Sequence, residues 1–135
     1  MIKKLDLKMA GIISIAIAVL TIAVHLLVVF QVMPYTWING GRSASYEIAR
    51  QTSINSVIIF LFGMPITLIA CRIIPVKLNK FWTVLLTVYL WINVLLTCIG
   101  VAEQLLGTIF EKCCMSIVVL VALIVGLRIA LEKRW

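Results

Sequence analysis

The sequence predicts an all-α membrane protein that folds as an antiparallel bundle of four transmembrane helices. The first observation behind this prediction is composition, because 64% of the 135 residues are hydrophobic and only 13% are charged. A soluble domain of this size cannot bury so much apolar surface. The second observation is that the apolar residues gather into four stretches, each long enough for the roughly 20 residues that cross a bilayer. We therefore expect one transmembrane domain over residues 1–135.

The basic residues predict the orientation of this bundle. Nine of the twelve Lys and Arg residues lie before the first stretch, between the second and third, or after the fourth. Positive residues beside membrane spans stay on the cytoplasmic side, so both chain termini should be cytoplasmic. The three at the other two gaps are Arg42, Arg50 and Lys112, and the nine are Lys3, Lys4, Lys8, Arg72, Lys77, Lys80, Arg128, Lys133 and Arg134.

The first span is predicted at about residues 9–33 and ends before Pro34. Its apolar run is too long for the core of a signal peptide and no A-x-A cleavage site follows it, so we expect a retained helix. Small and polar residues recur every three or four positions and share one face, which should point into the bundle. These residues are Gly11, Ser14, Ala18, Thr21 and His25.

The segment 34–53 is the one long loop and should lie outside the cell. Trp37 suits the headgroup layer of the membrane, where amphipathic rings settle. Residues 39–41, Asn-Gly-Gly, favour a tight turn. Ser43 or Ser45 could cap a helix that continues into the second span.

The second span is predicted at about residues 54–74, with a kink at Pro65. The inner loop, 76–80, is short and predicts that the second and third spans are antiparallel neighbours. The third span covers about residues 81–104, and the fourth, the most uniformly apolar, covers about residues 114–131.

A polar stripe on the third span points to the interior of the bundle. Asn93 should be its most buried strongly polar side chain and should hydrogen-bond to another helix. A bond of this kind contributes roughly 0.6 to 2 kcal/mol in membranes. The other members of the stripe are Thr97, Gly100 and Gln104.

Six charged residues should gather at the outer end of the bundle and form its candidate binding surface. They could build an ion-pair network across the bundle mouth, bind a ligand or a lipid headgroup, or remain ordinary solvated charges. Arg42 follows the glycine turn of Gly40 and Gly41, and such a turn can present backbone N–H groups and a guanidinium to an anion. The six charges are Arg42, Glu47, Arg50, Glu103, Glu111 and Lys112.

His25 is the one histidine and the clearest titratable candidate inside the membrane. It could shuttle a proton or bind a metal, or it could be a neutral ring hydrogen-bonded to another helix. A single His without a second ligand at metal-binding spacing predicts no metal site. We expect no cofactor and assign no catalytic residue, since no phosphate loop or nucleophile motif occurs.

Other function classes are disfavoured by missing residues. A membrane thiol oxidoreductase needs a Cys pair in an outer loop, and the segment 34–53 has no Cys. A small four-helix drug exporter relies on an acidic residue in its first helix, which this chain lacks. The basic residues flank the spans instead of forming one patch, so nucleic acid is not an expected partner.

Several short motifs resemble those of a family of small, uncharacterised bacterial integral membrane proteins with four spans. These motifs are P-Y-T-W-I-N-G-G-R from Pro34, Y-E at Tyr46, E-K at Glu111 and G-L-R-I-A-L from Gly126. The family has a W-G-G-R loop, from which this chain departs by a spacer that includes Asn39. The resemblance implies a multi-pass protein of the bacterial plasma (inner) membrane and points to the outer loop, but it implies no activity.

The sequence thus favours a non-enzymatic binding or accessory protein that uses its outer surface. Its candidate binding residues are Trp37, Gly40, Gly41, Arg42, Glu47, Arg50, Glu103 and Glu111. Expected partners are the lipid bilayer and either a membrane protein or further copies of the chain. One alternative is a small transporter or channel-like oligomer with a polar path near His25, Asn93 and Glu103. Another is an enzyme that modifies lipids of the outer leaflet.

Overall fold

The computed structural model describes residues 4–134, so the predicted inner basic residue Lys3 lies outside the described residues. Over this range the secondary structure is entirely helical, and four segments are long and apolar enough to cross a membrane. The long helices are α1 (Leu7–Val29), α2 (Tyr46–Ala70), α3 (Lys80–Leu106) and α4 (Ser116–Ala130). A π-helix, η4 (Glu111–Met115), extends α4 at its start. The loop between α1 and α2 contains the short 3₁₀ helices η2 (Tyr35–Trp37) and η3 (Asn39–Gly41). We name it the outer loop, its end of the molecule the outer end and the opposite end the inner end, after the predicted orientation.

Polar side chains cap the starts of the first three long helices. Asp6 accepts a hydrogen bond from the backbone N–H of Met9 at 3.0 Å, and Asn79 caps α3 in the same way. Of the two serines predicted as possible caps, Ser45 caps α2, with its hydroxyl 3.4 Å from the nitrogen of Ile48. Each cap satisfies an N–H group that the helix itself leaves free. Consequently α2 begins well before residue 54.

The first helix ends earlier than expected, before Pro34 is reached. Gln31 adopts a left-handed conformation, with φ 60°, and the N–H of Val32 donates to the carbonyl of Leu27 at 2.8 Å. This is the Schellman arrangement, which satisfies carbonyl groups at a helix end. The second helix ends in the same way, with Arg72 at φ 56°. Pro34 and Pro75 therefore follow helix ends that backbone hydrogen bonds have already fixed, while Pro65 lies inside α2.

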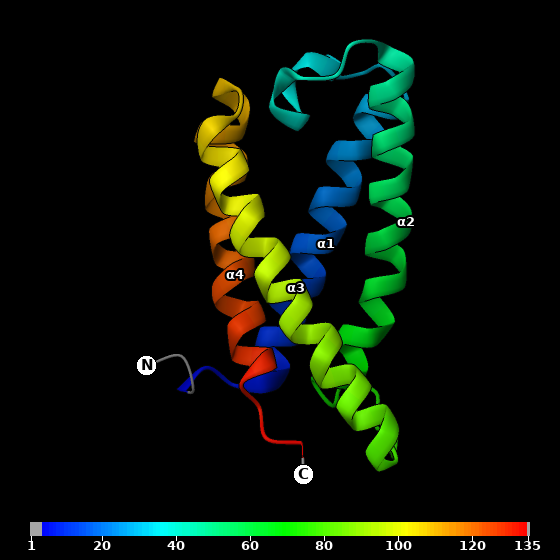
Figure 1. Ribbon diagram of the computed structural model, residues 1–135, viewed down its shortest axis with the longest axis vertical. Coiled ribbons are helices and arrows are strands. Elements are labelled where there is room, and N and C mark those ends of the chain that lie inside the picture. The colour runs from blue at the N-terminus through cyan, green and yellow to red at the C-terminus, as the bar shows by residue number, and fades with distance from the viewer. Residues whose placement is uncertain (1–3, 135) are drawn as a thin grey trace.

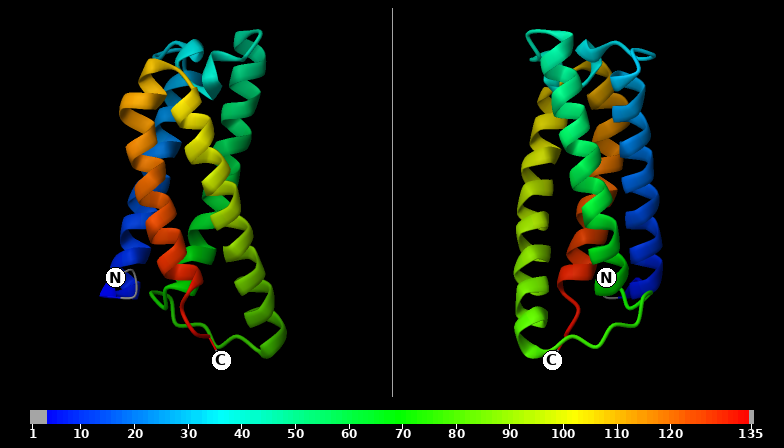
Figure 2. Two further views of the ribbon diagram at one scale, coloured as in Figure 1. Left: turned by 60° about the vertical axis from the view of Figure 1, so that its left-hand side comes forward. Right: turned by 90° about the vertical axis from the view of Figure 1, so that its right-hand side faces the viewer.

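The four helices lie side by side, with the start of α1 and the end of α4 at the same end of the molecule (Figure 1). Helix α1 packs against α2 and α4, and α4 packs against α3. Figure 2 shows α1 and α3 on opposite sides, with α2 and α4 between them. Helices α2 and α3 make few direct backbone contacts, but their side chains meet near Gly63, where an added Cβ would lie 3.3 Å from the Tyr89 hydroxyl. The two predicted neighbours therefore meet locally and do not pack along their length. Since α2 ends at Ala70, the connection to α3 is longer than the predicted loop and lets α3 stand apart.

Helices α1 and α2 approach each other most closely at Gly11. A Cβ atom placed on Gly11 would lie 2.7 Å from the Cβ of Cys71, so only glycine fits there. This contact uses the small-residue face that the sequence predicts for the first span. It belongs to a buried cluster near the inner end, whereas many large apolar side chains elsewhere are exposed, as expected for a chain solvated by lipid.

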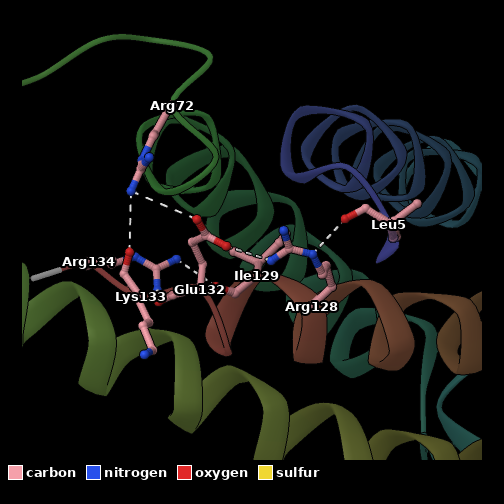
Figure 3. A network of polar contacts seen from close by, with 7 residues as sticks. All are labelled: Leu5, Arg72, Arg128, Ile129, Glu132, Lys133 and Arg134. Atoms are coloured by element: carbon pink, nitrogen blue, oxygen red, sulfur yellow. Dashed lines mark hydrogen bonds and ion pairs between the residues drawn. The ribbon is translucent and has the colours of Figure 1, made fainter. Parts of the chain in front are cut away.

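Arg128 and Glu132 together join the ends of three helices, whereas from the sequence Arg128 served only to predict the orientation of the bundle. Arg128 is 8% exposed, its Nε donates to the carbonyl of Leu5 at 2.7 Å, and its Nη1 lies 2.8 Å from Glu132 (Figure 3). Arg72, at the end of α2, lies 3.9 Å from the other Glu132 oxygen. These contacts hold the segment before α1 and the end of α2 against the end of α4.

Candidate functional site

A cavity with a volume of about 440 Å³ lies between the long helices. All four long helices line it, and Ile38, Asn39 and Glu111 line it at the outer end. Two of its lining residues, Ile59 on α2 and Leu96 on α3, are 68% and 60% exposed. Because α2 and α3 make few direct contacts, the cavity opens sideways between these two helices, towards the position of the lipid.

The polar stripes predicted on the first and third spans line this cavity. From α1 these are Ser14, Ala18, Thr21 and His25, and from α3 they are Asn93, Thr97 and Gln104. The sequence therefore identified the inward faces of both helices. Most of the remaining lining is aliphatic or aromatic, so the cavity combines an apolar wall with a few polar positions.

The two intramembrane polar residues behave differently. His25 Nδ1 lies 3.2 Å from the hydroxyl of Ser53, which is fully buried on α2. Of the alternatives predicted for His25, this contact matches a ring hydrogen-bonded to another helix. Asn93 instead donates to the carbonyl of Tyr89 in its own helix and is exposed, so the predicted bond across the bundle is wrong.

Glu111 is the most buried charged side chain at the outer end, with 3% of its surface exposed. Its Oε2 accepts a bond of 2.8 Å from the backbone N–H of Thr108, and the N–H of Glu111 donates to the Thr108 hydroxyl at 3.3 Å. This reciprocal pair is a capping box at the start of the fourth span. This cap was not predicted, although Thr-x-x-Glu directly before an apolar run is its sequence signal.

The same carboxylate also holds the outer loop. The backbone N–H of Gly40 lies 3.0 Å from each oxygen of Glu111. The turn that presents this N–H has positive φ at Asn39, Gly40 and Gly41, which glycine and asparagine tolerate best. A glycine turn was predicted to hold an anion, and in the structure that anion is a carboxylate of the chain itself.

A second loop contact reinforces this junction. The Thr108 hydroxyl donates to the carbonyl of Trp37 at 2.6 Å, and the rings of Trp37 and Phe110 lie 5.8 Å apart. Gly107 leaves room for the carboxylate, since a Cβ there would overlap Oε2 of Glu111. The structure thus brings together Trp37, Gly40 and Glu111 from the predicted site residues, with Gly41 beside them in the turn.

The remaining predicted outer charges do not join this junction. Arg42, Glu47, Arg50, Glu103 and Lys112 are all exposed. The ion pairs of residues 4–134 lie at the inner end, so no ion-pair network spans the outer mouth among the described residues. Glu103 is not part of the cavity lining, and its place is taken by the adjacent Gln104.

Two buried polar atoms beside the cavity lack a hydrogen-bond partner in the described chain. They are Nδ2 of Asn39, a donor, and Oε1 of Gln104, an acceptor. Both residues line the outer end of the cavity together with Glu111. A buried polar atom without a partner costs about 1 to 3 kcal/mol, and either amide group would have to turn to present that atom to the cavity.

The fold is that of a multi-pass membrane protein with a cavity between its helices. Residues 4–134 contain no cluster of three or more potential metal ligands. Comparisons with protein-family models, with curated proteins and with solved structures gave no match. The resemblance to small bacterial four-span proteins therefore stays a prediction.

Proposed function

We propose that this chain is a non-enzymatic binding protein of a bacterial plasma membrane, which takes up an amphiphilic molecule from the bilayer. In this proposal it is an antiparallel four-helix bundle with cytoplasmic termini, and residues 34–45 form its outer cover. The single observation that carries the proposal is the cavity of about 440 Å³ that opens between Ile59 and Leu96. Its volume lies within the range of roughly 300 to 1,000 Å³ typical of small-molecule sites.

The geometry favours a ligand from the membrane over one from water. The sideways opening faces the acyl chains, while the loop bound to Glu111 covers the outer end. An apolar wall with a few polar groups suits a molecule with a hydrocarbon tail and a small polar head. This arrangement supports a lipid ligand more than the outer-surface partner that the sequence alone favours, because Glu111 and Gly40 already bind each other.

A transporter remains a second candidate, because the cavity reaches Asn93, as a polar path through the membrane requires. The lipid-enzyme alternative is weaker. The Glu111 carboxylate accepts bonds from the backbone N–H groups of Gly40 and Thr108, and this structural role accounts for its burial without a catalytic one.

Native mass spectrometry of the full chain, purified in mild detergent from bacterial membranes, tests the proposed binding. We expect about one lipid-sized adduct per chain, and loss of that adduct in Thr97→Phe, which fills the cavity. Thr87→Phe is the matched control, since Thr87 lies on the same helix, bonds to the carbonyl of Thr83 and does not line the cavity. Absence of any adduct, or equal loss in both variants, would contradict the proposal.

The membrane orientation is tested separately with single cysteines in a cysteine-free chain. A membrane-impermeant thiol reagent added to intact cells should modify a cysteine at position 42 and leave one at position 77 unmodified until the cells are broken. The reverse pattern would place residues 34–45 in the cytoplasm and overturn the proposed orientation.

A further inference from the structure

We propose that the inner end carries a second site, which binds an anionic phospholipid. A hydrocarbon chain of the lipid lies in a groove between α2 and α3, and its phosphate lies beside Lys77 and Lys80. The inference is independent of the proposed function, because it concerns a different pocket. Two observations carry it, namely the apolar lining of the groove and the two neighbouring lysines, which form no ion pair among residues 4–134.

The groove lies where α2 ends and α3 begins, with a volume of about 230 Å³. Its lining comes from α2, from Leu78 in the connection and from α3, and every lining side chain is aliphatic or aromatic. Trp82 and Leu85 of this lining are 53% and 48% exposed, so the groove is open to the bilayer. It is smaller than the roughly 300 to 1,000 Å³ typical of small-molecule sites, so it suits part of a hydrocarbon chain with the head outside.

The chain segment that forms the groove is basic. Residues 66–89, which include the whole lining, contain three basic residues and no Asp or Glu. Lys77 directly precedes Leu78 of the lining, and Lys80 lies two residues before Trp82. Both lysines are exposed. Their long flexible stems can carry the ammonium groups to a phosphate at the edge of the groove.

The third basic residue of this segment, Arg72, has partners within the chain and is not assigned to the site. Its Nη2 donates to the carbonyl of Lys133 at 3.3 Å and lies 3.9 Å from Glu132 (Figure 3). The connection that follows Arg72 crosses the space between the end of α2 and the start of α3 (Figure 2). The cations available to a headgroup at the groove are therefore those of Lys77 and Lys80.

An anionic phospholipid uses both features of this site. Its chain covers the apolar lining, and its phosphate supplies the negative charge that the two lysines lack. The ring of Trp82 suits the same headgroup layer. A soluble phosphate ester has no chain to place in the groove. A zwitterionic lipid brings a cation of its own, which the lysines repel.

The test compares two lipids with identical acyl chains, phosphatidylglycerol and phosphatidylcholine. Delipidated full-length protein is titrated with each in an uncharged detergent, and the bound fraction is read by native mass spectrometry. We expect phosphatidylglycerol to bind at least about tenfold more tightly. Equal affinity would overturn the inference. Displacement of phosphatidylglycerol by a large excess of glycerol 3-phosphate would assign the site to a soluble phosphate ester and would also overturn it.

Two double variants test the position of the phosphate. At about fivefold per lysine, Lys77→Gln with Lys80→Gln should bind phosphatidylglycerol about 25-fold more weakly and phosphatidylcholine as before. The matched control, Lys4→Gln with Lys8→Gln, removes two exposed positive charges at the same end, beside α1, which lies on the opposite side from α3. Equal weakening in both double variants would reveal a general effect of net charge and refute the site.

Leu85→Trp tests the position of the hydrocarbon chain, because the larger side chain fills the groove. It should abolish the preference for phosphatidylglycerol. Val84→Trp changes a neighbouring exposed residue that does not line the groove and should keep that preference. Retained preference in Leu85→Trp would contradict the groove as the binding position.

Thr97→Phe separates this site from the larger cavity. The variant should keep the preference for phosphatidylglycerol even where it loses the adduct from native membranes. Loss of that preference would place the anionic lipid in the larger cavity and overturn the second site. If the native adduct is absent but phosphatidylglycerol still binds beside Lys77 and Lys80, the proposed function fails and the second site stands.

Discussion

The backbone N–H of Gly40 lies 3.0 Å from both carboxylate oxygens of Glu111, a residue 71 positions further along the chain. This contact joins the outer loop to the start of the fourth span. Because Glu111 also completes the capping box with Thr108, one buried side chain fixes a helix start and a distant turn together. The position of the outer loop over the outer end of the cavity therefore depends on this carboxylate.

Glu111→Gln tests that dependence. The variant keeps the size of the side chain but replaces one acceptor oxygen with an NH₂ group, which faces backbone donors. We expect the free energy of unfolding to fall by about 1 to 3 kcal/mol, and protease cleavage within residues 34–45 to become faster. Thermal unfolding in detergent and limited proteolysis measure the two effects. Glu103→Gln, an exposed carboxylate at the same end, should change neither, and equal effects in both variants would argue against the junction.

Gly107→Ala should be destabilising because its Cβ would overlap the Glu111 carboxylate. Overpacking of this kind costs about 1 to 3 kcal/mol, which a lower midpoint of thermal unfolding would reveal. The comparison variant is Gly100→Ala, whose Cβ would meet Val119 at an ordinary 3.7 Å. That change should leave stability the same or raise it by up to about 1 kcal/mol, because alanine favours a helix. A Gly107→Ala protein as stable as Gly100→Ala would mean that the carboxylate is not confined there.

Gly11→Ala should separate α1 from α2, since the new methyl group would lie 2.7 Å from the Cβ of Cys71. We expect a loss of about 1 to 3 kcal/mol in unfolding free energy. Removing the opposing Cβ with Cys71→Gly should recover part of this loss. A double-mutant cycle then gives a coupling of about 0.5 kcal/mol or more, whereas strict additivity would show that the two residues do not press on each other.

Arg128→Met should release the segment that precedes α1. The variant keeps an apolar stem but loses the bonds to the carbonyl of Leu5 and to Glu132. We expect faster amide hydrogen exchange at residues 4–10 and a loss of about 1 to 3 kcal/mol in unfolding free energy. Lys133→Met removes an exposed charge at the same end and serves as the control. Exchange at residues 4–10 that is no faster than in this control would contradict the proposed tether.

The sequence by itself determined the number of spans and the faces that line the interior. Long apolar runs exclude water regardless of their neighbours, so four membrane-crossing helices follow from composition alone. The spacing of Ser14, Thr21 and His25 identified the inward face of α1, because helical periodicity is a local property. The Thr-x-x-Glu signal at Thr108 was equally local and was available to sequence reasoning.

Only the tertiary structure decided which of these elements meet. Asn93 bonds within its own helix instead of across the bundle, and the sparse contact between α2 and α3 leaves the cavity open between Ile59 and Leu96. The partner of Gly40 is Glu111, which lies 71 residues further along the chain, and no local sequence pattern specifies that pairing. The physical reason is that packing geometry depends on the whole chain, whereas periodicity and capping depend on a few neighbouring residues. The sequence identified polar groups that face inward, and the fold decided that Asn39 and Gln104 are left without partners at one end of a lipid-facing cavity.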